Sequence, residues 1–163
     1  MNNRITLQSI PNGRAGVDAT LRKMRELIHT GKLNYDVRQC AVRLVRNIRP
    51  QKHYWAMVGA IHAFVRDNIA YVLDIDGVET LHPAEVVLSN RAGDCDDKVI
   101  LLCSLLASIG LQTRIRAVAV DSPECNHVMA DVWLEDKWIP LETTEPVPVG
   151  WSPPATMNAI LEV

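Results

Sequence analysis

The residue best suited to covalent chemistry is Cys95, which lies in a charged turn within GDCDDKVILLCSLLASIG (residues 93–110). The apolar run predicts a helix that begins at this cysteine, where unpaired backbone N–H groups and the helix dipole favour a thiolate. We therefore expect the pKa of the Cys95 thiol to be lowered. The carboxylates of Asp94, Asp96 and Asp97 act in the opposite direction, although Asp94 can cap the helix and the other two favour its first turn. A thiolate here needs a cationic partner.

His127 is the best candidate for that partner, because it opens a strand-like segment over residues 127–134. A two-residue turn at residues 135–136 would set Met129 opposite Glu142 on the next strand. His127 and Glu142 would then be diagonal neighbours on one face, with backbones roughly 7–8 Å apart. A glutamate side chain can bridge that distance to an imidazole nitrogen. A turn one residue later would keep His127 and Glu142 on the same face of the sheet but increase the distance between them.

Asp131 is the competing acid, since it shares a face of the predicted strand with His127. Four residues along a strand correspond to about 13 Å, which is too far for a hydrogen bond. We therefore predict a triad in which Cys95 attacks, His127 takes and later returns a proton, and Glu142 fixes the imidazole tautomer. The N–H of Cys95 would help to stabilise an oxyanion, and Asn90 is one possible second donor.

The other cysteines are not expected to act as nucleophiles or metal ligands. Cys40 and Cys103 lie on apolar helix faces and are expected in the core. Cys95, Cys125 and His127 could in principle meet around zinc, but Cys-x-His is not a usual ligand spacing. The chain has no CxxC pair, so we expect free thiols in a reducing compartment. We expect neither a metal nor another cofactor.

Hydrophobic periodicity predicts the elements that would position these residues. Apolar residues at helical spacing indicate three helices before the cysteine, over residues 15–29, 35–48 and 53–69. His62, in the third of them, is expected to be either a helix-surface residue or a core histidine with satisfied hydrogen bonds. A short strand and a turn are expected over residues 70–80, followed by a short helix with Pro83 in its first turn. The helix that begins at Cys95 should end at Gly110 and be buried nearly all round.

After this helix the apolar residues alternate, which predicts three strands, over residues 111–120, 127–134 and 137–144. Helices, a buried central helix and then an antiparallel sheet indicate an α+β fold. The proline-rich tail, residues 145–163, is expected to extend over the surface. Three tryptophans are expected in the core or in the wall of a cleft, namely Trp133, Trp138 and Trp151. If the protein were a binding module instead of an enzyme, they would be its contact residues.

Length and composition are those of a single globular domain. The chain has 163 residues, 48% of them hydrophobic and 22% charged, so it can bury a core without a metal or disulfide. We see no signal-type segment and no apolar run of about 20 residues, so we expect a cytoplasmic protein that does not bind membranes. Residues 14–52 hold ten Lys/Arg against three Asp/Glu. We expect them to form solvated helix faces rather than a nucleic-acid surface.

Three segments resemble the transglutaminase-like superfamily. LSNRAGDCDDKVILLCSLLASIGLQTRIRAV resembles its core signature, in which Gly-x-Cys opens a buried helix and Gly-x-x-x-Arg leads into a strand. HVMADVWLEDKWIPLETT resembles the histidine strand of the family, and AIHAFVRDNIAYVLD resembles the helix before the site. The match spans about residues 53–144. It leaves a helical extension, residues 1–52, and the tail, residues 145–163, within one domain of residues 1–163.

The resemblance implies a papain-like fold, with N-terminal helices and a buried Cys-bearing helix packed on an antiparallel sheet, and a thiol acyl-transfer mechanism. It places the nucleophile at Cys95, the base at His127 and the third acid at Glu142. The family usually has aspartate at the third position. The longer glutamate must therefore re-aim or weaken its contact with His127.

The leading hypothesis is a cysteine hydrolase that acts on peptide or amide bonds, with a peptide, a protein or an amide as its substrate. One alternative is transfer of the acyl group to an amine, which requires water to be excluded. Another is a catalytically silent binding or assembly module with the same fold. The intact cysteine, histidine and acid favour an enzyme, because a binding module has no need of all three. Substrate identity and oligomeric state do not follow from the sequence.

Overall fold

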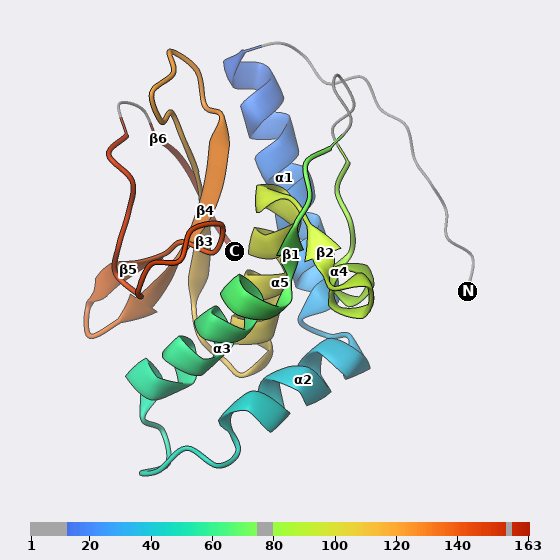
Figure 1. The fold of residues 1–163 in the computed structure, drawn as a ribbon, viewed down its shortest axis with the longest axis vertical. Coiled ribbons are helices and arrows are strands. Elements are labelled where there is room, and N and C mark those ends of the chain that lie inside the picture. The colour runs from blue at the N-terminus through green and yellow to red at the C-terminus, as the bar shows by residue number, and fades with distance from the viewer. Residues whose placement is uncertain (1–12, 75–79, 156–157) are drawn as a thin grey trace.

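The computed structural model describes residues 13–74, 80–155 and 158–163. Its helices are α1 (Arg14–Gly31), α2 (Tyr35–Val45), α3 (Tyr54–Asn68), α4 (Ala84–Asn90) and α5 (Cys95–Ser108). Its strands are β1 (Ala70–Tyr71), β2 (Ala92–Gly93), β3 (Thr113–Val118), β4 (His127–Leu134), β5 (Lys137–Leu141) and β6 (Asn158–Glu162). The helices gather on one side of a four-stranded antiparallel sheet (Figure 1), which confirms the predicted α+β class. The turn predicted within residues 70–80 lies largely outside the described residues.

Helix α5 is at the centre of the fold, between the other helices and the sheet (Figure 1). It contacts each of the four other helices as well as β3 and β4. Every residue from Asp96 to Leu106 is buried, as the nearly continuous apolar sequence predicts. The Asp94 side chain caps the helix by accepting from the N–H of Asp97 at 3.0 Å, and Gly110 follows its end in the left-handed region. Both predicted boundary residues are therefore confirmed.

The N-terminal helices are amphipathic, and each buries one stripe against α5. The buried stripe of α3 has the predicted helical spacing and consists of Val58, Ile61, His62 and Val65. Helix α2 begins with Asn34 as its N-cap and ends at Val45, earlier than the predicted residue 48. The proline at position 50 disfavours helical backbone in the residue before it, and the chain has already turned away by then. Among the described residues, no helix is both long and apolar enough to cross a bilayer.

The large sheet has the strand order β5-β4-β3-β6, and every neighbouring pair in it is antiparallel. The hairpin between β4 and β5 has the predicted register, with Leu134 opposite Lys137. Glu135 and Asp136 form its turn, and both have positive φ values, 49° and 59°. A two-residue type I′ hairpin turn requires positive φ at both of its residues. The turn in this way fixes the register between β4 and β5.

The tail differs in part from the prediction of an extended surface segment. Its first part does cross the sheet, where Gly150 N–H donates to Pro140 O at 2.9 Å and Ser152 contacts Met129. Its end, however, is the edge strand β6, which pairs with β3. The missed signal is a short alternation in which Ala159 is buried while Ile160 is 49% exposed. Such a short strand is stabilised by its neighbour in the sheet and has little signal of its own.

Candidate active site

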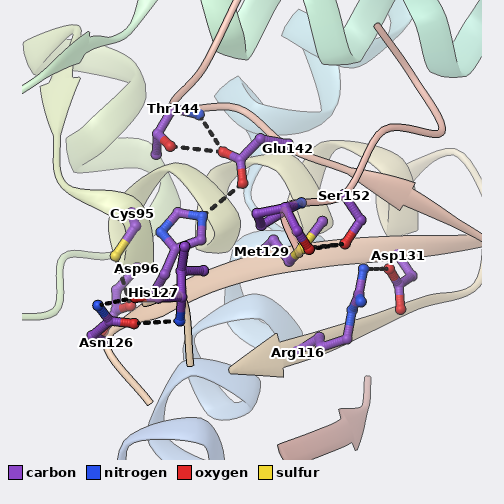
Figure 2. A network of polar contacts seen from close by, with 12 residues as sticks. Cys95, Asp96, Arg116, Asn126, His127, Met129, Asp131, Glu142, Thr144 and Ser152 are labelled. Atoms are coloured by element: carbon purple, nitrogen blue, oxygen red, sulfur yellow. Dashed lines mark hydrogen bonds and ion pairs between the residues drawn. The ribbon is translucent and has the colours of Figure 1, made fainter. Parts of the chain in front are cut away.

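Cys95 is the first residue of α5, as predicted, and its side chain is partly accessible. Its Sγ lies 3.5 Å from the carboxylate Oδ1 of Asp96, and the backbone N–H of Val128 donates to the sulfur. Val128 follows His127 at the start of β4. The N-terminus of α5 and the start of β4, which are remote in sequence, therefore meet at the sulfur (Figure 2).

Gly93, two residues before the cysteine, is required by close packing rather than by its backbone conformation. It lies in β2, beside Tyr71 of β1, and its φ is not in the left-handed region. A Cβ added at Gly93 would lie 2.5 Å from the Cβ of Asp97. The close approach of the first turn of α5 to the preceding strand therefore requires glycine at this position.

The prediction of a lowered thiol pKa is wrong for this arrangement. Burial raises the pKa of the Cys95 thiol well above its ordinary value, and the carboxylates of Asp96 and Asp94 raise it further. The N–H of Val128 lowers the pKa, but by less. Because burial depends on how α5 packs, the sequence position at a helix N-terminus did not reveal this effect. The resting sulfur is consequently a protonated thiol rather than a free thiolate.

His127 and Glu142 come together as the hairpin register requires. The imidazole Nε2 lies 2.6 Å from the carboxylate Oε2 of Glu142. Figure 2 shows the imidazole between this carboxylate and the sulfur of Cys95, with its other nitrogen, Nδ1, toward the sulfur. An Nε2–H that donates to the carboxylate leaves Nδ1 as an acceptor, which is the tautomer that can take a thiol proton.

The carboxylate of Glu142 is buried, with 1% of the residue exposed, and both of its oxygens accept hydrogen bonds. The backbone N–H and the hydroxyl of Thr144 donate to Oε1 at 2.6 and 2.8 Å (Figure 2). Burial by itself raises the pKa of Glu142, but the bonds from His127 and Thr144 outweigh it and lower the pKa below its ordinary value. The longer side chain was expected to re-aim or weaken the contact with His127, and the 2.6 Å distance shows no weakening.

Asp131, the competing acid, is occupied elsewhere. Its Oδ2 accepts from Arg114 at 2.7 Å and its Oδ1 from Arg116 at 2.9 Å. The guanidinium of Arg114 also stacks over the ring of Trp138, 4.6 Å from the ring centroid. This cluster stabilises the sheet, and the predicted exclusion of Asp131 as the partner of His127 is confirmed.

His62 is a residue whose role sequence reasoning did not find. It is buried on α3, and its Nε2 lies 2.5 Å from the backbone carbonyl oxygen of Glu142. Of the two predicted possibilities, the core histidine with a satisfied hydrogen bond is the one observed. The available signal was a polar residue within an otherwise apolar helical stripe, since such a residue needs a buried partner.

Asn90 is the candidate second oxyanion donor, and Tyr71 is a further polar residue whose pKa responds to Cys95. Asn90 ends α4 and is exposed, and no hydrogen bond within the described residues links it to Cys95. Tyr71, 47% exposed, lies close enough to the site to sense its charges. Burial raises the pKa of its phenol, and proximity to Cys95 adds to that rise. Tyr71 is therefore a neutral phenol within electrostatic range of the thiol, which sequence reasoning did not identify.

The remaining cysteines have structural surroundings. Cys40 and Cys103 are buried and free, and burial raises the pKa of Cys103 to about 12. Cys125 is free and partly accessible. Within the described part of the chain, no group of three or more His, Cys, Asp or Glu side chains could hold a metal ion.

A cysteine at the start of a buried helix, facing a histidine–carboxylate pair held by an antiparallel sheet, is an arrangement associated with thiol acyl transfer. The family model of the transglutaminase-like superfamily matches residues 38–143, well over half of the chain. The protein belongs to the transglutaminase-like superfamily. Among proteins with curated functions, no match to this sequence is found.

Several solved structures share the fold. A Parabacteroides distasonis protein provisionally assigned as a protease superposes with a TM-score of 0.63 at 16% identity, over 85% of this chain and 30% of that one. A Cytophaga hutchinsonii protein provisionally assigned as a cysteine protease superposes with a TM-score of 0.57 at 18% identity, over 77% of this chain and 46% of that one. LapG of Legionella pneumophila superposes with a TM-score of 0.54 at 18% identity, over 77% of this chain and 71% of that one. This chain spans less than half the length of the first two proteins, and likeness at these identities establishes the fold.

Proposed function

We propose that the protein is a cysteine-dependent acyl-transfer enzyme that hydrolyses peptide or amide bonds, with Cys95 as nucleophile, His127 as general base and acid, and Glu142 as the orienting acid. The observation that carries this proposal is the 2.6 Å bond from His127 Nε2 to Glu142, which leaves Nδ1 of the same ring toward the sulfur. A structural histidine–carboxylate pair has no need of a cysteine on its other side.

The raised thiol pKa makes proton transfer part of the attack rather than a step before it. As Sγ of Cys95 bonds to the substrate carbonyl carbon, Nδ1 of His127 accepts the thiol proton. The ionised carboxylate of Glu142 stabilises the imidazolium that results. The N–H of Cys95, at the start of α5, is available to the oxyanion. The imidazolium then protonates the leaving amine, and an acyl thioester remains on Cys95.

Water resolves that thioester in the proposed reaction. His127 takes a proton from the water as it attacks, and it returns the proton to sulfur when the acid leaves. An amine in place of water would give transfer instead of hydrolysis through the same steps. The proposed substrate is a peptide, a protein or another amide, with neither nucleic acid nor membrane as partner. The four free thiols support a reducing compartment, and we infer a cytoplasmic location.

Peptide vinyl sulfones of varied sequence provide a direct test, because they trap an activated thiol at a site that binds peptides. We expect adducts on Cys95 in the wild type and none after His127→Ala, as measured by intact mass and peptide mapping. Cys125→Ala serves as the matched control, since Cys125 is the other partly accessible thiol. Equal labelling of the two cysteines, or undiminished labelling of Cys95 in His127→Ala, would contradict the proposal.

The trapping peptide sequences then guide a substrate screen. Wild-type protein and Cys95→Ala are incubated with the matching amides, with and without a primary amine. Release of acid indicates hydrolysis, and an amide of the added amine indicates transfer. Binding of these peptides without turnover or trapping would instead identify a silent module.

A further inference from the structure

We infer that His62 is a positioning residue for the proposed reaction: from α3 it holds the main chain of Glu142 where the carboxylate meets His127. This inference rests on the proposed function. Nε2 of His62 lies 2.5 Å from the carbonyl oxygen of Glu142, and a carbonyl oxygen can only accept. Nε2 must therefore carry the hydrogen. Since His62 is 1% exposed, little solvent can replace this donor.

The charge state of His62 fits this role. Burial lowers the pKa of the imidazole, and its bond to the Glu142 carbonyl offsets that change only in part. The ring is consequently neutral near pH 7. A neutral ring places no second positive charge close to the carboxylate that His127 requires.

Glu142 needs such an anchor because it lies just beyond the sheet. The pairing of β4 with β5 ends at Ala130 and Leu141, so Glu142 follows the last paired residue of its strand. The carboxylate must nevertheless reach His127, and a displacement of about 1 Å at a catalytic group can lower a rate by up to about 100-fold. The carbonyl bond to His62 and the side-chain bonds from Thr144 hold the two ends of Glu142.

Helix α3 holds this loop at a second point as well. Arg66 lies one helical turn after His62, and its Nη1 donates to the carbonyl of Val147 at 2.9 Å. Two residues on one face of α3 thus bind the chain that leaves β5. The helix in turn is joined to α5 by the buried Lys98, whose ammonium donates to Ile69 O at 2.9 Å and to Arg66 O at 3.3 Å.

These contacts form a closed path through the site. It runs from Cys95 along α5 to Lys98, across α3 to His62, and through Glu142 to His127. The next residue, Val128, donates its N–H to the sulfur and closes the path. A change at His62 can therefore alter the reaction without touching either the substrate or the sulfur.

The test compares His62→Phe, which keeps a ring but loses the donor, with His62→Gln, which retains an N–H at a similar reach. The readout is the rate of Cys95 alkylation by iodoacetamide from pH 5 to 9, measured by peptide mapping. At pH 7 we expect His62→Phe to react about 10- to 100-fold more slowly than wild type. His62→Gln should recover most of the rate, and the exposed His29→Phe on α1 is the matched control.

A double mutant separates positioning from general loss of structure. If His62 acts through Glu142, then adding His62→Phe to Glu142→Gln should slow alkylation no further. A purely structural role would lower the melting temperature yet leave the pH profile of Cys95 unchanged, and that result would overturn the inference. If neither His127→Ala nor Glu142→Gln affects alkylation, the proposed function itself fails. If they do and His62→Phe does not, only the inference fails.

The protonation state of His62 can also be measured in the wild-type protein, so this test does not depend on whether the variants fold. With ¹⁵N-labelled histidine, His62 should appear as a neutral ring with its hydrogen on Nε2 and slow exchange of that hydrogen. An Nδ1–H tautomer, or a ring that is protonated at pH 7, would overturn the inference.

Discussion

Replacing Glu142 with aspartate, the residue that the family usually has, is the most informative single change. The side chain would be one methylene shorter, while His62 would still hold the main chain from the carbonyl side. Aspartate should therefore be a poor substitute in this chain, because the backbone here is placed for the longer residue.

The magnitude follows from the geometry of the contact. Loss of one carbon–carbon bond length, about 1.5 Å, would lengthen the 2.6 Å contact between His127 and the carboxylate to about 4 Å. That distance is beyond a hydrogen bond. A bond to a charged group contributes about 1.5–3 kcal/mol. With 1.36 kcal/mol for each tenfold change, we expect Glu142→Asp to slow the reaction of Cys95 roughly 10- to 160-fold.

The assay is alkylation of Cys95 by iodoacetamide at pH 7, followed by peptide mapping, with the same comparison repeated on the amide substrates once they are found. Asp131→Asn is the control for loss of a buried carboxylate on the same sheet, since Asp131 binds arginines rather than His127. It should lower the melting temperature and leave the alkylation rate close to that of wild type.

A wild-type rate for Glu142→Asp would refute this reasoning. It would mean that the chain after β5 moves freely enough to carry a shorter carboxylate to His127. The bonds from His62 and Thr144 would then be consequences of the fold rather than determinants of the site.

Three other predictions concern pH and packing. Asp96→Asn should lower the pKa of Cys95 toward its ordinary value and so raise its alkylation rate at pH 7, because burial would remain but the nearby carboxylate charge would not. Folding lowers the pKa of Glu142, so its ionised carboxylate contributes stability above about pH 4.5. That contribution is lost as pH falls through the folded pKa. In denaturant titrations, acid should therefore destabilise wild type more than Glu142→Gln. Gly93→Ala should reduce stability by about 1–3 kcal/mol, seen as a lower melting temperature, because its Cβ would lie 2.5 Å from that of Asp97.

Features that depend on neighbours in sequence were predictable. The helix that begins at Cys95 has its cap at Asp94 and its terminator at Gly110 within a few residues of its ends. The β4–β5 hairpin is set by two turn residues, and its register in turn brings His127 and Glu142 to one face. Capping, turn geometry and the two-residue strand period are all local, so the sequence carries enough information for each.

Features that depend on burial were not predictable in the same way. The thiol pKa was expected to fall, and it rises because α5 is enclosed by helices and sheet. Strand β6 was missed because its pairing with β3 joins segments far apart in the chain. The requirement for glycine at position 93 also depends on packing, because a contact with Asp97 decides it and not its φ.

The sequence by itself determined which side chains could form the site and how the hairpin would align two of them. The tertiary structure alone decided that α3 contacts the candidate site, through His62 on the carbonyl of Glu142, and that burial raises the pKa of the thiol. The reason is physical: periodicity and turn preferences act over a few residues, whereas desolvation and hydrogen bonds between distant segments exist only once those segments are packed together.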